Sequence, residues 1–204
     1  MIVALGRELG AGGRDIGERI AERLGVELLD KQIVDLVAAR LGAPTSYVEA
    51  LDENVESFVD RLFGVMRSAY PEAYAAEGLP DWSEERMVEL TASIIKEHAT
   101  HSLVIIGRGA PMLLRDRPDA VRAFITAPSE VRVRRVQART GCAAEFAARE
   151  VKRSDQHRLA YMRQYYNVDW RDARLYDVVV NTEHLSADAA ADVIIATGNR
   201  LALV

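Results

Sequence analysis

Short apolar runs alternate with amphipathic stretches along this 204-residue chain. The apolar runs are nearly continuous, as in strands that are buried on both faces of a parallel sheet. They predict strands at 2–5, 26–29, 103–106, 121–127 and 178–180. Apolar residues at three- and four-residue spacings predict the intervening helices, at 14–24, 31–41, 45–70, 83–98, 129–139, 143–166 and from about 186. Strands that alternate with helices indicate an α/β fold with a parallel sheet and right-handed crossovers.

A glycine-rich turn follows the first expected strand directly. Four glycines fall between Gly6 and Gly13. A strand that leads through such a turn into a helix points backbone N–H groups and a helix N-terminus at a phosphate. A tight turn that only uses the positive φ of glycine is the simpler alternative, but it needs fewer glycines. A dinucleotide-binding fingerprint fails, because G-x-G-x-x-G starting at Gly10 would require glycine where Asp15 stands.

The turn departs from the standard phosphate-loop pattern at the two positions that carry side-chain chemistry. In G-x-x-x-x-G-K-[ST], the lysine reaches the terminal phosphates and the hydroxyl holds magnesium. Aligned on Gly10-Ala11-Gly12, the lysine position is Gly13. A cation follows at once, as Arg14, and the carboxylate of Asp15 comes next. Asp15 either holds Mg²⁺, directly or through water, or merely favours the first turn of the helix.

Composition and charge exclude several classes of protein. A formal net charge of −5 argues against general nucleic-acid binding. Cys142 is the only cysteine, so no intrachain disulfide forms and a reducing compartment is expected. Met1 leads straight into the first strand, which leaves no signal peptide, and no apolar run reaches the length of a membrane span. We therefore expect a cytoplasmic protein with no membrane partner.

The charge is unevenly distributed along the chain. Residues 130–163 carry nine Lys or Arg against four Asp or Glu, over the two expected helices at 129–139 and 143–166. A charge-rich helix is often only a solvated surface. Beside a phosphate loop, however, basic helices that close over the loop would neutralise charge on a transferring phosphoryl group.

These pieces together resemble the cytidylate-kinase-like group of phosphate-loop nucleoside monophosphate kinases, over most of the chain. The segment 6–16 looks like this group's own loop, in which the standard lysine is also absent. Five further segments resemble the group: the aspartate near the acceptor, the strand-end Gly-Arg, the strand-to-lid junction, the lid's Asp-x-x-Arg and the final strand. They lie at 28–31, 105–109, 127–132, 154–158 and 176–182.

The resemblance implies a three-layer fold of the P-loop NTPase type, with helices on both faces of a parallel sheet. It implies one kinase-like domain over 1–204, with a helical acceptor-side insertion and a helical lid. The acidic insertion is interpreted as an acceptor domain, a dimer surface or both, so a homodimer is left open. The expected parts are the phosphate loop and first βα units at 1–44, the insertion at 45–100, core strands at 101–128, basic lid helices at 129–172, and the last strand and helix at 173–204.

The resemblance also implies a phosphotransferase that moves a phosphoryl group from ATP, with Mg²⁺, to a small-molecule nucleotide such as CMP. Asp15 is the candidate metal ligand. The expected donor-phosphate site is Gly10, Ala11, Gly12, Gly13, Arg14 and Asp15; the catalytic cations are Arg14, Arg153 and Arg158; the acceptor contacts are Asp30, Arg108 and Asp155.

Two of the acceptor contacts have a simpler alternative. Asp30 could instead cap the helix that follows it, and Asp155 could form only an ion pair with Arg158.

Two positions depart from true cytidylate kinases, which have an aspartate on each side of the Gly-Arg pair where this chain has Ile106 and Gly109. Recognition of the base and sugar is therefore expected to differ. Two other functions remain open. The missing lysine favours a nucleotide-binding regulatory module with little catalysis, whereas the lid arginines favour a kinase. A kinase for a non-nucleotide metabolite would have a similar sequence.

Overall fold

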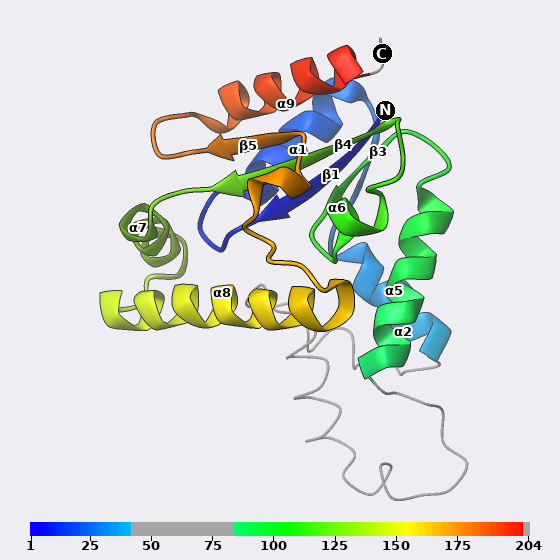
Figure 1. Cartoon of the computed structure of the whole chain (residues 1–204). Helices are drawn as coiled ribbons and strands as arrows, with labels where there is room; N and C mark the ends of the chain where they lie inside the picture. The colour runs from blue at the N-terminus through cyan, green and yellow to red at the C-terminus, as the bar shows by residue number, and fades with distance from the viewer. Residues whose placement is uncertain (42–83, 202–204) are drawn as a thin grey trace, which may run out of the picture. The chain divides into compact units, whose positions relative to one another are not determined.

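The computed structural model describes residues 1–41 and 84–201. Its elements follow the alternating order that the sequence predicts (Figure 1). The helix expected over 45–70 and the loop after it lie outside the described residues. The elements are β1 (Ile2–Arg7), α1 (Gly13–Leu24), β2 (Glu27–Leu29), α2 (Gln32–Leu41), α5 (Glu84–His98), β3 (Leu103–Ile106), α6 (Ala110–Leu113), β4 (Ala120–Thr126), α7 (Ser129–Thr140), α8 (Ala144–Tyr166), a 3₁₀ turn (Ala173–Leu175), β5 (Val178–Asn181) and α9 (Ala187–Leu201).

The chain packs as two compact units. The first unit comprises Met1–Asp30 and His98–Val204, and the second is Lys31–Glu97. Within the second unit, an ion pair between Arg40 and Glu97 joins the last turn of α2 to the last turn of α5. The candidate site described below belongs entirely to the first unit.

The first unit is built on a parallel five-stranded sheet in the order β2-β3-β1-β4-β5. The central strand β1 pairs with β3 on one side and with β4 on the other. Since all strands run in the same direction, the carboxyl ends of β1 and β3 meet at one edge. Open α/β sheets bind their ligands at this edge.

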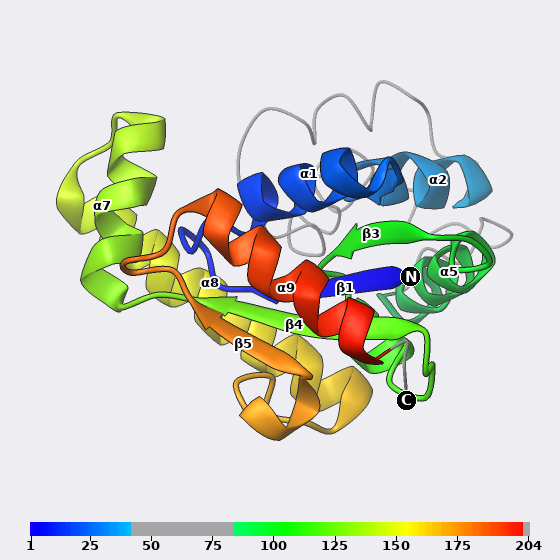
Figure 2. The same cartoon turned by 90° about the horizontal axis from the view of Figure 1, so that it is seen from above.

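Helices cover both faces of this sheet. α1 and α9 pack side by side on one face (Figure 2), where their apolar side chains meet those of the strands. The opposite face carries α6 and an aromatic cluster to which the C-terminal half of α8 contributes. The expected three-layer arrangement is therefore confirmed. The aromatic cluster consists of Met112, Phe124, Met162, Trp170 and Tyr176.

Two short elements were not predicted from the sequence. α6 has four residues and the 3₁₀ turn has three. Elements of this length contain about one turn or less, so no periodic pattern of apolar residues can identify them. α6 begins directly after the turn that ends β3, at the carboxyl edge of the sheet, whereas the 3₁₀ turn leads into β5.

Candidate active site

The glycine-rich loop leaves its backbone donors open at the start of α1. Gly10 and Gly12 both adopt left-handed backbone conformations, with φ of 80° and 83°. Gly12 is the N-cap of α1 and offers no side chain to accept a hydrogen bond. The first N–H groups of a helix have no acceptor within the helix. The loop therefore presents donors at Gly13, Arg14 and Asp15, which suits a phosphate group.

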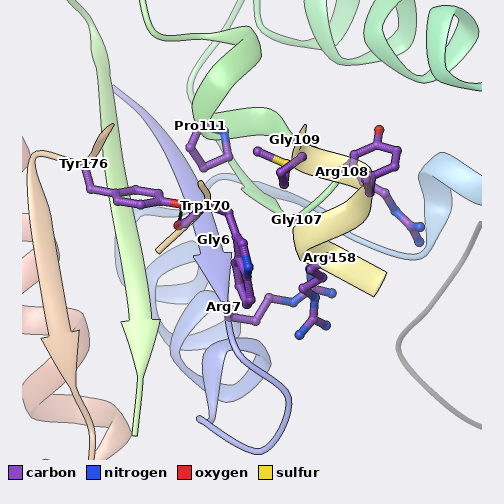
Figure 3. Close-up of a pocket in the computed structure, with 11 residues that line it drawn as sticks. Gly6, Arg7, Gly107, Arg108, Gly109, Pro111, Arg158, Trp170 and Tyr176 are labelled. Carbon is purple, nitrogen blue, oxygen red and sulfur yellow. Dashed lines mark hydrogen bonds between the residues drawn. The ribbon is translucent and has the colours of Figure 1, made fainter. Parts of the chain in front are cut away.

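A pocket lies beside this loop at the carboxyl edge of the sheet (Figure 3). The ends of β1 and β3 form its floor, α8 contributes one wall, and Trp170 and Tyr176 contribute another. Three arginines from different parts of the fold line it: Arg7 at the end of β1, Arg108 in the turn after β3, and Arg158 on α8. Three cations in one pocket favour a ligand that carries several negative charges.

The electrostatic environment of Arg108 is unfavourable for its charge. Burial, and then the positive charges of Arg7 and Arg158, lower the pKa of its guanidinium to about 9, while Asp30 acts in the opposite direction. The Nε atom of Arg108 and both terminal nitrogens of Arg158 are shielded from solvent. Like charges that are held together out of water are costly. A bound anion would remove that cost.

The turn that carries Arg108 is conformationally strained. Gly107, Arg108 and Gly109 have positive φ angles of 76°, 57° and 70°. The left-handed region costs a residue with a side chain about 1 kcal/mol or more. Strain of this kind is retained where the surrounding structure fixes a functional side chain. The turn places Arg108 at the edge of the pocket, just beyond the end of β3.

Trp170 forms the aromatic wall between two cations. The guanidinium carbon of Arg158 lies 5.7 Å from the centre of its indole, and that of Arg171 lies 5.4 Å away. The Tyr176 hydroxyl donates a hydrogen bond to the Trp170 carbonyl at 2.6 Å. Phe124 stacks on Tyr176 and meets Trp170 edge to face. These contacts hold the wall rigidly against the sheet.

A network of four charges joins the glycine loop to α7 and α8. Arg132 on α7 binds Asp155 on α8 through both terminal nitrogens, at 3.0 and 2.9 Å, and lies 3.3 Å from Glu8 of the loop. Arg171 reaches both carboxylates, at 2.8 Å for Glu8 and 2.7 Å for Asp155. Two positive and two negative charges balance, which lets Arg132 lie almost completely buried.

This network changes the interpretation of α7. The sequence predicts a basic helix that faces the phosphates, but Arg132 is engaged internally and Arg135 donates hydrogen bonds to Thr182. Arg132 and Arg135 therefore attach α7 to the loop, to α8 and to the segment after β5. The cation of the two basic helices that lines the pocket is Arg158 of α8.

The other predicted site residues are not among those that line this pocket. Arg14 is half exposed and pairs with Glu18 at 2.9 Å, and Arg153 is 56% exposed and pairs with Glu150 at 2.6 Å. Asp15 is exposed in the first turn of α1. Asp30 follows β2 at the carboxyl edge, and its charge acts on both Arg14 and Arg108.

The sequence did not predict that three further residues belong to the site. Arg7, Trp170 and Arg132 acquire their places only through contacts with residues far away in the chain. Arg7 carried a usable signal, because it stands at the first position of the six-residue phosphate-loop spacing that ends at Gly12.

The fold and the loop place this chain in the P-loop class of α/β proteins. A family model described as the cytidylate kinase-like family matches residues 2–184. The chain therefore belongs to the cytidylate kinase-like family, as its motifs indicate. A cytidylate kinase from Methanosarcina barkeri is 33% identical over 88 residues, which are 42% of this chain and 48% of that protein. The matched stretch thus spans about half the length of this relative.

Solved structures show the same fold. An uncharacterized protein from Eubacterium ventriosum superimposes with a TM-score of 0.71 at 24% identity, over 98% of each chain. Shikimate kinase from Bacteroides thetaiotaomicron gives a TM-score of 0.51 at 16% identity, over 98% of this chain and 95% of that one. Within residues 1–41 and 84–201, no helix combines the length and apolar character that a membrane crossing requires.

Proposed function

We propose that this protein transfers the terminal phosphoryl group of ATP, with Mg²⁺, to a nucleoside monophosphate such as CMP. The observation that carries the proposal is the convergence of Arg108 and Arg158 in one pocket beside the glycine loop. One cation comes from the sheet edge and one from the lid helix. A regulatory module that only binds a nucleotide has no use for such a clamp around a transferring group.

The residues fit a nucleotide donor. The uncapped N-terminus of α1 supplies backbone donors from Gly13 to Asp15 for the donor phosphates. In the part of the chain that the structure describes, no group of three or more His, Cys, Asp or Glu forms a metal site. A nucleotide-bound Mg²⁺ needs only one or two carboxylates together with phosphate oxygens, and Asp15 would supply one. The ion would neutralise charge on the β- and γ-phosphates.

The transfer requires little covalent chemistry from the protein. An oxygen of the acceptor phosphate forms a bond to the γ-phosphorus, while the bond from that phosphorus to the bridging oxygen breaks and ADP leaves with the electron pair. The attacking oxygen is already anionic, so no proton has to be removed. Positioning and charge neutralisation therefore account for catalysis. Arg108 would hold the acceptor phosphate, and Arg158 would stabilise the transferring group.

The turn after β3 bears on the choice of acceptor. A side chain at Gly109 would collide with the end of the Tyr166 side chain, so the aspartate of true cytidylate kinases would require Tyr166 to move. Burial, and then the neighbouring Tyr161, raise the pKa of the Tyr166 phenol, which therefore stays neutral. A neutral hydroxyl in place of a carboxylate would recognise a different set of base or sugar donors. The acceptor must consequently be determined by experiment.

The decisive assay is direct detection of product from ATP and Mg²⁺ with each of the common nucleoside monophosphates, with nucleosides, shikimate and gluconate as controls. Transfer to one monophosphate well above the rest supports the proposal and names the acceptor. Binding of ATP without transfer to any of them would favour the regulatory module. Transfer to a control alone would make the protein a metabolite kinase.

Arg158→Ala tests the clamp. Because the contact should strengthen as charge develops, we expect turnover to fall by about 100-fold, while the Kd for ATP rises less than about threefold. Isothermal calorimetry and initial rates measure the two quantities. Arg115→Ala is a matched control, since Arg115 is 64% exposed and pairs with the adjacent Asp116. Unchanged turnover in Arg158→Ala would remove this residue from the mechanism.

A further inference from the structure

Two positions of the phosphate loop have exchanged their residue types. The standard pattern G-x-x-x-x-G-K opens with a glycine and places the lysine directly after the second glycine. With Gly12 as the second glycine, the opening position is Arg7 and the lysine position is Gly13. The chain thus has a cation where the pattern has glycine, and glycine where the pattern has the cation.

The two exchanged positions touch in space. A Cβ atom built on Gly13 would lie 2.6 Å from Cβ and 2.8 Å from Cγ of Arg7. Contacts of this length between carbon atoms do not occur, so the aliphatic stem of Arg7 occupies the space that a side chain at position 13 would need. The absence of lysine is therefore a consequence of where Arg7 lies.

The head of Arg7 extends from this contact into the pocket. Its Nη1 atom lies directly over Gly107, at the point where a side chain on that glycine would begin. Arg7 consequently crosses from the end of β1 to the end of β3, and its guanidinium lies in the pocket with Arg108 and Arg158 (Figure 3). This location is next to the glycine loop and faces the proposed acceptor cation.

The guanidinium of Arg7 is available to pair with a ligand. Among the described residues, its guanidinium takes part in no ion pair or side-chain hydrogen bond. Arg14, the cation that follows the loop in sequence, is instead paired with Glu18 on the exposed side of α1. The carboxylate next to Arg7, Glu8, is committed to Arg132 and Arg171.

We propose that Arg7 is the phosphate-loop cation of this protein, and that its guanidinium binds the terminal phosphates of the donor nucleotide in place of the missing lysine. This assignment rests on the proposed function, because it concerns the donor side of the same site. A planar guanidinium can bind two phosphate oxygens at once, whereas a lysine ammonium acts as a point charge. Arg7 thereby lies between the donor and acceptor phosphates.

The test is a cycle of three variants: Arg7→Gly, Gly13→Lys and the double variant, which restores the standard pattern. Calorimetric titration with ATP and Mg²⁺, and with inorganic tripolyphosphate, measures donor binding. We expect Arg7→Gly to lose about tenfold or more in affinity for both ligands, which corresponds to a lost charged hydrogen bond. Gly13→Lys alone should be destabilised, because its stem meets Arg7. The double variant should recover donor affinity.

Arg7→Met keeps the aliphatic stem and removes only the charge, so it carries the test if Arg7→Gly does not fold. Arg115→Ala again controls for the loss of one positive charge. Loss of donor affinity in Arg7→Met, with Arg115→Ala unchanged, supports the assignment. Unchanged donor affinity in Arg7→Met, in an enzyme that still transfers phosphate, would overturn it while the kinase function stands. If the double variant bound ATP and tripolyphosphate no better than Arg7→Gly does, the idea that positions 7 and 13 have exchanged the phosphate-binding cation would be overturned.

The wild-type protein itself could bind neither ATP nor tripolyphosphate, which differs from both outcomes described for the variants. That result would overturn the proposed function and the assignment of Arg7 together. The wild-type titration therefore comes first, because it separates the two failures.

Discussion

The backbone and the charge of Arg108 both lie in unfavourable surroundings. Its backbone is left-handed, with φ of 57°, and its guanidinium shares a pocket with two other arginines. Burial and the charge of Arg7 lower its pKa to about 9. Groups that are destabilised in the free protein are typical of functional sites, where stability is exchanged for activity.

Arg108→Met should therefore stabilise the ligand-free protein by about 1 to 2 kcal/mol. Since the pKa of Arg108 is lower in the folded than in the unfolded chain, the folded state binds fewer protons, and wild-type stability rises with pH above about 9. The advantage of the variant should consequently be complete below pH 9 and shrink above it. Thermal unfolding at pH 7 and pH 10 measures this difference.

The same variant should lose the stabilisation that the acceptor gives the wild-type protein. Arg115→Met serves as the control for replacing an arginine with methionine. If Arg108→Met were less stable than the wild type and still stabilised by acceptor, Arg108 would be a structural residue rather than a binding residue.

At the scale of elements, the glycine loop and α7 are packed backbone to backbone. A Cβ atom on Gly10 would lie 2.6 Å from the carbonyl oxygen of Arg132. A Cβ atom on Gly12 would meet nothing within 4 Å, although the φ angles of the two glycines are nearly equal. A comparison of Gly10 with Gly12 therefore distinguishes two roles of glycine: both positions need its positive φ, but only Gly10 also needs the absence of a side chain for close packing.

Gly12→Ala should cost about 1 to 2 kcal/mol of unfolding free energy, because alanine is strained at positive φ. Gly10→Ala should cost a further 1 to 3 kcal/mol or so, because it also pushes α7 away from the loop. Urea unfolding of the two ligand-free variants gives the comparison. Equal losses would mean that α7 can move aside freely, and that its contact with the loop is loose.

At the scale of the whole molecule, one charge network connects four segments. Glu8, Arg132, Asp155 and Arg171 come from the loop, α7, α8 and the segment after α8. Asp155 is expected from the sequence to bind the acceptor, but the structure engages its carboxylate with Arg132 and Arg171. The position of α8, and with it of Arg158, depends on this network.

Asp155→Asn should lower the unfolding free energy by about 3 kcal/mol, since it leaves the buried Arg132 with an excess positive charge. Asp116→Asn, at a 90% exposed carboxylate, should change stability little. Chemical unfolding and the acceptor KM are measured together. A stable Asp155→Asn protein with a raised acceptor KM would return this residue to the acceptor site.

The sequence predicts well what depends on local pattern. The run at 103–106 identifies a strand that is buried on both faces, and the structure places β3 there. The spacing of the glycines identifies the start of α1. Arg108 could be located as well, because a residue that follows a buried parallel strand must lie at the carboxyl edge of the sheet.

The remaining features depend on contacts that no local pattern contains. Arg132 looks like any surface arginine of a basic helix, yet its carboxylate partner Glu8 lies on the phosphate loop. The role of Arg7 depends on its packing against Gly13 and Gly107. Sequence identifies the residue types of the site, whereas the pairing of its charges follows from the tertiary fold.

Trp170 gives this protein a built-in optical signal. The guanidinium of Arg158 lies against its indole, and the same arginine lines the pocket. Indole emission responds to nearby charge, so a ligand that draws Arg158 toward a phosphate would alter the fluorescence of Trp170. The only other tryptophan is Trp82. A Trp82→Phe protein would therefore report the arrival of each nucleotide in real time, without an added dye.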